Sequence, residues 1–202
     1  VYVIEGQHPK DVLTGLGALV GTMPLPPKWA IGYHQCRYSY FPEKRVREIA
    51  ENFRARNLPC DVIWFDIDYM DQYKVFSFDK SHFPDPKKLN ADLQAMGFNC
   101  IWMINPGVKD EPGFWVNDQG DEKKLWVTTA SGETYRGEVW PGWCNFPDYT
   151  RPDVREWWQG LYKDFMAHGI DGVWNDMNEP AIFNVKSKTM PEDNIHKGGE
   201  WD

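Results

Sequence analysis

The apolar residues of the chain recur with two different spacings, which predict helices and strands in alternation. At 42–57 they recur every three or four residues, the spacing of an amphipathic helix with one buried face. The same spacing is found in three further segments, which are 9–21, 86–96 and 150–168. Near-continuous apolar runs lie between these helices, at 29–36, 60–65, 98–104 and 172–175. Such runs are typical of strands that are covered on both faces, as in parallel sheets.

Strand followed by helix, repeated along the chain, is the pattern of a parallel α/β fold. Polar residues follow each predicted strand, which favours a (β/α)8 barrel with a site at the carboxyl ends of its strands over a doubly wound sheet. The predicted strands make the first half of such a barrel. Because a half-barrel has open edges, we expect this chain to be a piece of it, or to pair with the remainder of the barrel.

The predicted elements fall into two domains and an insertion. Residues 1–28 are expected to hold a strand that ends an upstream domain, a helix and a proline-rich linker. The barrel half is expected to occupy 29–202. Within it, 108–148 is rich in glycine, tryptophan and charge, and its length predicts an insertion subdomain after the third strand rather than a loop. No element is predicted for the polar stretch 186–202.

Composition limits the classes of function that the chain can have. It has 202 residues, a net charge of −8 and no basic stripe of the kind that neutralises nucleic-acid phosphates. It has no run of about 18 apolar residues, and its first six residues lack the layout of a signal peptide. We therefore expect neither a nucleic-acid nor a membrane partner. Aromatic residues make up 15% of the chain, many beside Asp or Asn, and such surfaces suit sugar rings; a Trp-rich core is the alternative.

The cysteines show no Cys-x-x-Cys spacing of a metal or redox site. They are Cys36, Cys60, Cys100 and Cys144. Three of them fall in or beside apolar runs, so we expect free, buried thiols, with a disulfide or a metal set as the alternative. Free thiols fit a reducing compartment, cytoplasmic or plastid-like.

Residues 173–180 concentrate polar chemistry at the end of the last predicted strand. Asp176 and Glu179 supply carboxylates, and Asn175 and Asn178 supply amides that can donate hydrogen bonds to them. Burying so many polar groups is costly unless something pairs with them, and a ligand rich in hydroxyls would do so. Glycoside hydrolysis needs a carboxylate on one face of the anomeric carbon and a carboxylic acid on the other. The alternative is that these residues cap a following helix.

A second polar cluster, which consists of Asp66, Asp68 and Asp71, follows the strand predicted at 60–65. Its carboxylates suit hydrogen bonding to substrate hydroxyls. An apolar strand that ends in Asp-x-Asp is also how some phosphoryl-transfer enzymes begin, which leaves a magnesium site open as an alternative. Solvated turn positions are a further alternative for Asp68 and Asp71.

Two other features are candidates for the same site. His34 lies at the end of the first predicted strand. A lone histidine there is more often structural than catalytic, and we retain it only as a candidate substrate contact. The stretch Trp140-Pro141-Gly142-Trp143 predicts a rigid aromatic wall or, alternatively, part of the core of the insertion.

Four stretches of the sequence, taken together, resemble the retaining α-glucosidases of glycoside hydrolase family 31. They cover nearly the whole chain in the family's order, and are Pro24–Arg37, Asp61–Asp71, Trp140–Tyr149 and Trp174–Pro180. Gly137–Gly142 and Lys188–Glu192 are closest to the plant and cyanobacterial branch of the family, which acts on soluble heteroglycans and related α-glucans.

The resemblance implies roles for individual residues. Asp176 is implied to be the nucleophile that forms a covalent glucosyl-enzyme intermediate, and Asp66 to bind hydroxyls of the glucose that is released. Trp64, Trp140 and Ile104 are implied to line the same subsite. Asp148 is implied to support the site. Val1–Gly6 is implied to be the last strand of a β-sandwich domain that precedes the barrel. The resemblance implies no metal and no cofactor.

Two departures from the family's pattern bear on activity. In the family the third strand usually ends in Asp, where this chain has Asn105, so one charge near the sugar is removed. The family's acid/base aspartate lies on a later strand, and no residue after Pro180 matches it. Glu179, the other candidate catalytic carboxylate, is too close to Asp176 in sequence to reach the opposite face of the sugar.

We therefore expect a fragment of an exo-acting α-glucosidase that releases glucose from the non-reducing ends of α-linked glucans or oligosaccharides. An α-glucan lyase on the same scaffold and a non-catalytic carbohydrate-binding protein are the alternatives.

Overall fold

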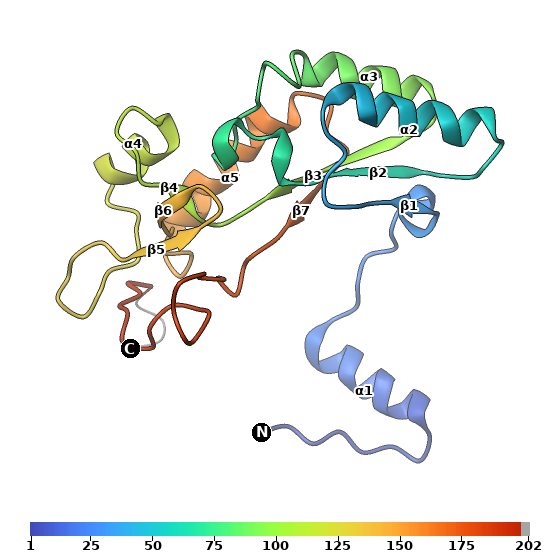
Figure 1. Ribbon diagram of the computed structural model, residues 1–202. Coiled ribbons are helices and arrows are strands. Elements are labelled where there is room, and N and C mark those ends of the chain that lie inside the picture. The colour runs from blue at the N-terminus through green and yellow to red at the C-terminus, as the bar shows by residue number, and fades with distance from the viewer. Residues whose placement is uncertain (199–202) are drawn as a thin grey trace.

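The computed structural model describes residues 1–198, and a parallel sheet lies at its centre (Figure 1). The strands of this sheet lie in the order β1 (His34–Gln35), β2 (Val62–Phe65), β3 (Asn99–Ile104) and β7 (Gly172–Asn175). Helices connect them: α2 (Glu43–Ala55) follows β1, α3 (Pro86–Ala95) follows β2, and α5 (Pro152–Met166) precedes β7. Parallel neighbours joined by helices are the repeat of a (β/α)8 barrel, so the predicted α/β fold and the first half of a barrel are confirmed.

The main core fills the space between the sheet and its helices. Phe65 and Trp102, which are paired in register, stack on this side with ring centroids 3.9 Å apart. Figure 1 shows α2 and α3 side by side along one side of the sheet. Each helix turns a stripe of buried apolar residues inward: Val46 and Ala50 from α2, Leu89 and Leu93 from α3, and Val154, Trp157, Leu161 and Phe165 from α5.

A small insertion lies between β3 and α5, as the composition of 108–148 predicts. It contains β4 (Val108–Lys109), α4 (Trp115–Glu122), β5 (Arg136–Val139) and β6 (Gly142–Asn145). The strands form an antiparallel sheet in the order β4-β6-β5. A separate core supports this sheet, and it consists of Val127, Tyr135, Val139, Cys144, Phe146 and Ile182. Because Ile182 follows β7, the segment after β7 packs onto the insertion.

The first strand is much shorter than the apolar run at 29–36 predicts. Lys28–Ile31 forms a 3-10 turn, and only two residues pair with β2. Gly32 then redirects the chain against Asp61, whose carboxylate accepts the Tyr33 N–H at 3.2 Å. A Cβ at Gly32 would lie 2.0 Å from Asp61 Oδ2, so this approach requires glycine. A short apolar run has no periodicity that distinguishes such a turn from a strand.

The two ends of the described chain lie outside the main core. Residues 1–6 form no strand with any other part of 1–198, so the predicted terminal strand is not formed here, because a strand needs a neighbour to complete its hydrogen bonds. The helix α1 (Pro9–Val20) has no buried residue. The domain boundary at 28 stays a prediction. Residues 176–198 contain no helix, so the alternative in which the acids after β7 cap a helix is wrong. Residues 199–202, the last part of the stretch without predicted elements, lie outside the described residues.

All the cysteines are free, as predicted, but only three are buried. Burial raises the pKa of the Cys144 thiol to about 12. Cys36 is exposed because β1 ends at Gln35 and the chain leaves the sheet there, so the prediction of a buried thiol is wrong for Cys36. No helix in the described part of the chain has the length and hydrophobicity needed to cross a bilayer.

Candidate active site

The register of the sheet places two carboxylates on one face. β2, β3 and β7 are aligned at Trp64, Ile101 and Gly172. Side chains alternate between the faces of a strand, so residues an even number of positions further along share a face. Asp66 follows Trp64 in this way, and Asp176 follows Gly172. Both carboxylates therefore lie at the carboxyl ends of their strands, on the face that is opposite the main core and lines a barrel's axis.

Two tryptophans and a histidine lie on the same face, and each indole lies two residues before a carboxylate on its strand. Trp64 and Trp174 meet edge to face with ring centroids 5.6 Å apart, although β3 separates their strands. The Trp64 Nε1–H donates to His34 Nδ1 at 3.1 Å, which requires that nitrogen to be an unprotonated acceptor. His34 Nε2 is buried without a partner within residues 1–198. His34 thus orients the Trp64 indole and lies beneath the rim.

Asp66 is half-buried at the end of β2, where its Oδ1 accepts the Ile67 N–H at 2.7 Å. Burial raises the pKa of the Asp66 carboxyl, the Ile67 N–H opposes that rise, and the negative charges of Asp176 and Asp68 add to it. Asp66 and Asp176 therefore interact electrostatically across β3. A carboxylate held in this way is a strong acceptor for donated hydroxyl hydrogens.

The backbone holds Asp176 at the rim. Its N–H donates to the Ile104 carbonyl at 3.1 Å, which extends the pairing of β3 and β7 by one residue. Its own carbonyl accepts the Asn178 side-chain amide at 2.8 Å. Met177 then adopts a left-handed conformation with φ of 60°, and the chain turns away from the sheet. The turn ends the strand and leaves the partly exposed Asp176 side chain at the open end of the sheet.

The amides beside Asp176 do not donate to its carboxylate, contrary to the sequence-based expectation. Asn175 is one position out of phase, so its side chain lies on the helix side of the sheet, where Tyr162 of α5 donates to Asn175 Oδ1 at 2.7 Å. Asn178 binds the backbone carbonyl of Asp176 and so shapes the turn.

Asn105 lies level with Asp176, because Ile104 pairs with Asn175 one position earlier on each strand. It is 3% exposed, and neither atom of its amide has a partner within residues 1–198. A buried, unpaired amide is costly and rare in native proteins. A neutral side chain here avoids placing a third carboxylate beside two that already repel each other.

Trp140 reaches the rim from the insertion and is 38% exposed. Its ring packs edge to face on Phe183 at 5.0 Å and lies 6.2 Å from Tyr38 and 6.3 Å from Tyr73. Burial and then the charge of Asp68 raise the pKa of both tyrosines, which are thus near the acids after β2 as well as near Trp140. Trp140 is therefore part of an aromatic wall beside the carboxylates, and it does not belong to the core of the insertion.

Two predicted site residues are placed differently. Ile104 is 1% exposed and belongs to the main core, because its side chain lies on the helix side of β3 with Trp102. The prediction that Ile104 lines a subsite is therefore wrong. Met103 has the phase of Trp64 and Trp174. Glu179 is exposed in the turn after Asp176 and makes no hydrogen bond within residues 1–198, so the structure does not bring it to the carboxylate pair.

Trp174 begins one of the stretches that carry the family resemblance, but no site role is predicted for it, although the chain carries a signal for one. Trp64 and Asp66 are separated by one residue, and so are Trp174 and Asp176. The same Trp-x-Asp spacing at two strand ends puts an indole beneath a carboxylate twice.

Asp148 anchors the end of the segment that follows β7, at His196 and Lys197. Its side chain is completely buried, accepts the Lys197 N–H and the Thr150 hydroxyl, both at 2.6 Å, and lies 3.3 Å from His196 Nδ1. Burial alone would raise the pKa of Asp148, but these donors hold it below its ordinary value. The segment that it anchors closes a cavity of about 290 Å³, which is lined in part by Asn178 and Pro180.

The acidic cluster after β2 does not converge on a metal site. Asp71 pairs with Lys74 at 3.3 Å on the way out of the sheet. Nowhere among residues 1–198 do three His, Cys, Asp or Glu side chains come together to hold a metal ion.

A half-barrel with carboxylates and tryptophans at the carboxyl ends of its strands is typical of barrel enzymes that act on carbohydrates. The family model for the glycosyl hydrolases family 31 TIM-barrel domain matches residues 23–201, and the chain belongs to that family.

Several named proteins are similar to the chain. The chain is 48% identical over 195 residues to "Alpha-glucosidase 2" of Bacillus thermoamyloliquefaciens, covering 96% of this chain and 25% of that protein. It is 37% identical to human "Neutral alpha-glucosidase AB", covering 100% of this chain and 22% of that protein. The crystal structure of a family 31 alpha-glucosidase from Bacteroides thetaiotaomicron superposes with a TM-score of 0.85 at 53% identity, covering 95% of this chain and 33% of that one. The chain thus spans about a quarter of the length of its curated relatives.

Proposed function

We propose that the protein containing this chain is a retaining, exo-acting α-glucosidase that releases glucose from α-linked glucans or oligosaccharides. One observation carries the proposal: Asp176 and Asp66 share one face at the carboxyl ends of their strands, each two residues beyond one of the paired indoles of Trp64 and Trp174. Indoles offer flat apolar faces to the C–H groups of a pyranose, and carboxylates accept its hydroxyl hydrogens. The names of the relatives support the same activity.

In the proposed mechanism Asp176 is the nucleophile. Its carboxylate attacks the anomeric carbon, and the glycosidic C–O bond breaks as the leaving oxygen receives a proton from a carboxylic acid on the other face of the sugar. A glucosyl ester of Asp176 results. Water, deprotonated by the conjugate base of that acid, then attacks the anomeric carbon from the opposite side, releases Asp176 and gives glucose of retained configuration.

We propose that the remainder of the barrel supplies the acid/base carboxyl group. A retaining mechanism needs the two carboxyl groups about 5–5.5 Å apart on opposite faces of the sugar. Asp66 and Asp176 project from the same side of one sheet, and Glu179 points out to solvent. Closure of the sheet by later strands would bring a carboxyl group to the facing side.

The proposed glucose subsite combines three parts. Asp66 accepts hydroxyl hydrogens, Trp64 with Trp174 forms an apolar floor, and Trp140 forms a side wall. His34 contributes by holding Trp64 through its Nδ1. These roles stay predictions for each residue.

The branch of the family and the compartment are also proposals. Similarity to the plant and cyanobacterial branch rests on 137–142 and 188–192, and rice "Probable glucan 1,3-alpha-glucosidase" is 34% identical to the chain. The bacterial and human relatives named above have higher identities, so the overall identities do not favour that branch. A reducing compartment, cytoplasmic or plastid-like, is supported by the free thiols.

The stereochemistry of the product tests the proposal. The full-length protein is mixed with p-nitrophenyl α-glucoside, whose leaving group is not a sugar, in an NMR tube, and the anomeric proton of the glucose formed is followed before mutarotation. The proposal expects α-glucose, and it expects Asp176→Asn to reduce turnover by at least about 10³-fold. Initial formation of β-glucose would contradict a retaining mechanism, and an anhydro sugar would identify a lyase.

A further inference from the structure

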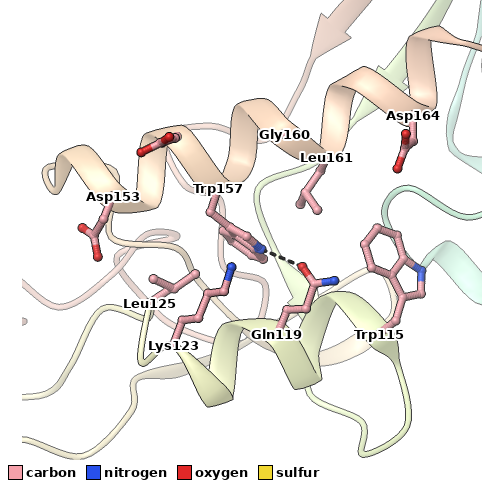
Figure 2. A pocket seen from close by; sticks show the side chains of 10 residues that line it. Trp115, Gln119, Lys123, Leu125, Asp153, Trp157, Gly160, Leu161 and Asp164 are labelled. Carbon is pink, nitrogen blue, oxygen red and sulfur yellow. Dashed lines mark hydrogen bonds between the residues drawn. The ribbon is translucent and has the colours of Figure 1, made fainter.

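A groove separate from the strand ends runs between α4 of the insertion and α5 (Figure 2). Its volume is about 560 Å³, within the range of small-molecule sites. Its floor is apolar and buried, and consists of Leu125, Trp157 and Leu161. Its edges carry polar and charged side chains from both helices.

The α4 side of the groove presents an exposed aromatic face. Trp115, Gln119 and Lys123 recur every four residues, so they lie along one side of the helix. The Trp115 indole is 44% exposed, and Figure 2 shows it projecting toward the α5 residues Leu161 and Asp164. Gln119 Oε1 accepts the Trp157 Nε1–H at 3.0 Å, which ties the two helices together across the floor and leaves the Gln119 amide hydrogens for a ligand.

On the α5 side of the groove, one lining position is a glycine and has no side chain. Gly160 lies inside the helix, where glycine weakens helical structure. A Cβ at this position would meet no atom within 4 Å, so close packing does not require glycine. Its effect is to leave space in the middle of the groove. Asp153 and Asp164 lie on either side of this gap along α5, as labelled in Figure 2.

We propose that this groove is a second carbohydrate-binding site, which holds a segment of α-glucan while another part of the chain is hydrolysed. The inference rests on the proposed function for the class of ligand. An exposed indole face, with amide, ammonium and carboxylate groups around it, matches a pyranose, whose faces are apolar and whose edges carry hydroxyls. Asp153 is paired with Arg151, but the carboxylates of Glu156 and Asp164 still outnumber Lys123, which disfavours anionic ligands such as phosphates.

Gel electrophoresis under native conditions tests binding, with the full-length protein carrying Asp176→Asn so that soluble starch in the gel stays intact. The starch should slow the protein, and Trp115→Ala should weaken the apparent affinity by roughly fivefold or more, the order expected for one aromatic contact. Gly160→Met should do the same by filling the groove. Because this substitution removes a glycine from the interior of a helix, the melting temperature of the variant should not fall. An unchanged melting temperature separates a blocked groove from a misfolded protein. Glu122→Ala, at an exposed residue of α4 that does not line the groove, is the control and should bind as the parent does.

Activity measurements with intact Asp176 distinguish failure of this inference from failure of the proposed function. Trp115→Ala and Gly160→Met should raise KM for starch and leave kcat/KM for p-nitrophenyl α-glucoside unchanged. If the parent protein hydrolyses neither substrate, the proposed function fails, and the gels alone judge the groove. The groove assignment is overturned if both variants are retarded like the parent, if Glu122→Ala weakens binding as much, or if raising the salt concentration abolishes retardation, since that marks attraction between charges.

Discussion

The indole rings of Trp64 and Trp174 meet edge to face at a centroid distance of 5.6 Å over the strand that lies between theirs. Two residues beyond each indole, on the same face, lie Asp66 and Asp176. The register of the sheet places Asp176 two residues further along the strand direction than Asp66, which is about 6–7 Å at 3.3 Å per residue. The pair is therefore staggered, so a single pyranose above the indoles can contact Asp66 through its hydroxyls and Asp176 at its anomeric carbon.

Asp66→Asn is expected to lower activity and raise stability. Loss of a charged hydrogen-bond acceptor should reduce kcat/KM by roughly 10- to 10²-fold. Burial and the charge of Asp176 raise the pKa of Asp66 in the folded state, so its ionised form favours the unfolded state at pH values above the unfolded pKa. Removing the charge should therefore increase the free energy of unfolding at neutral pH. Urea titrations at pH 7 check this, with Asp71→Asn as the control; a stability loss for Asp66→Asn would show that the carboxylate is structurally required.

Ile104→Val is expected to affect stability and spare substrate binding. The side chain is buried in the main core, so the free energy of unfolding should fall by about 0.5–1.5 kcal/mol. KM for maltose should stay within about twofold, because a core methylene does not contact the ligand. Trp140→Ala, on the exposed wall, should raise KM instead. A large KM change for Ile104→Val with unchanged stability would restore the residue to the subsite.

Strands β3 and β7 show why the fold could be predicted from the sequence but only part of the site could. The strand at 172–175 and the helices at 42–57 and 150–168 follow from apolar spacing alone, because burial of one face fixes their pattern. Ile104 and Asn175 could not be assigned to a face in this way. Strands covered on both sides are apolar throughout, so their phase becomes visible only through the register with neighbouring strands. Cys36 follows a two-residue strand that begins only after Gly32 and Tyr33 contact distant Asp61, and local sequence does not show that contact.

Glu179→Gln is expected to lose less than about tenfold in kcat, because this side chain is exposed in the turn and has no described partner. Asp176→Asn should lose at least about 10³-fold in the same assay. Steady-state hydrolysis of p-nitrophenyl α-glucoside compares the two variants. Equal losses would mean that both carboxylates take part in the chemistry.

Asp148→Asn is expected to loosen the segment behind the active-site turn. Loss of charged acceptors for the Lys197 N–H and the Thr150 hydroxyl should lower the free energy of unfolding by about 1–3 kcal/mol at pH 7. The pKa of Asp148 is lowered in the folded state, so its contribution is present above the unfolded value of about 3.9 and is lost as the pH falls through the folded value.

The difference in stability between wild type and Asp148→Asn should therefore shrink as urea titrations move from pH 7 toward acid. The exposed Asp193→Asn serves as the control and should show little difference at any pH. A difference that grows on acidification would contradict the assigned direction of the pKa shift.

Covalent trapping of the intermediate is the most direct test of Asp176 as the nucleophile. The full-length protein is inactivated with 5-fluoro-α-D-glucosyl fluoride, digested with pepsin, and the glycosylated peptide is located by tandem mass spectrometry. We predict one added fluoroglucosyl group, on the Asp176 side chain. A label on Asp66, on Glu179 or on a carboxylate outside this chain would contradict it.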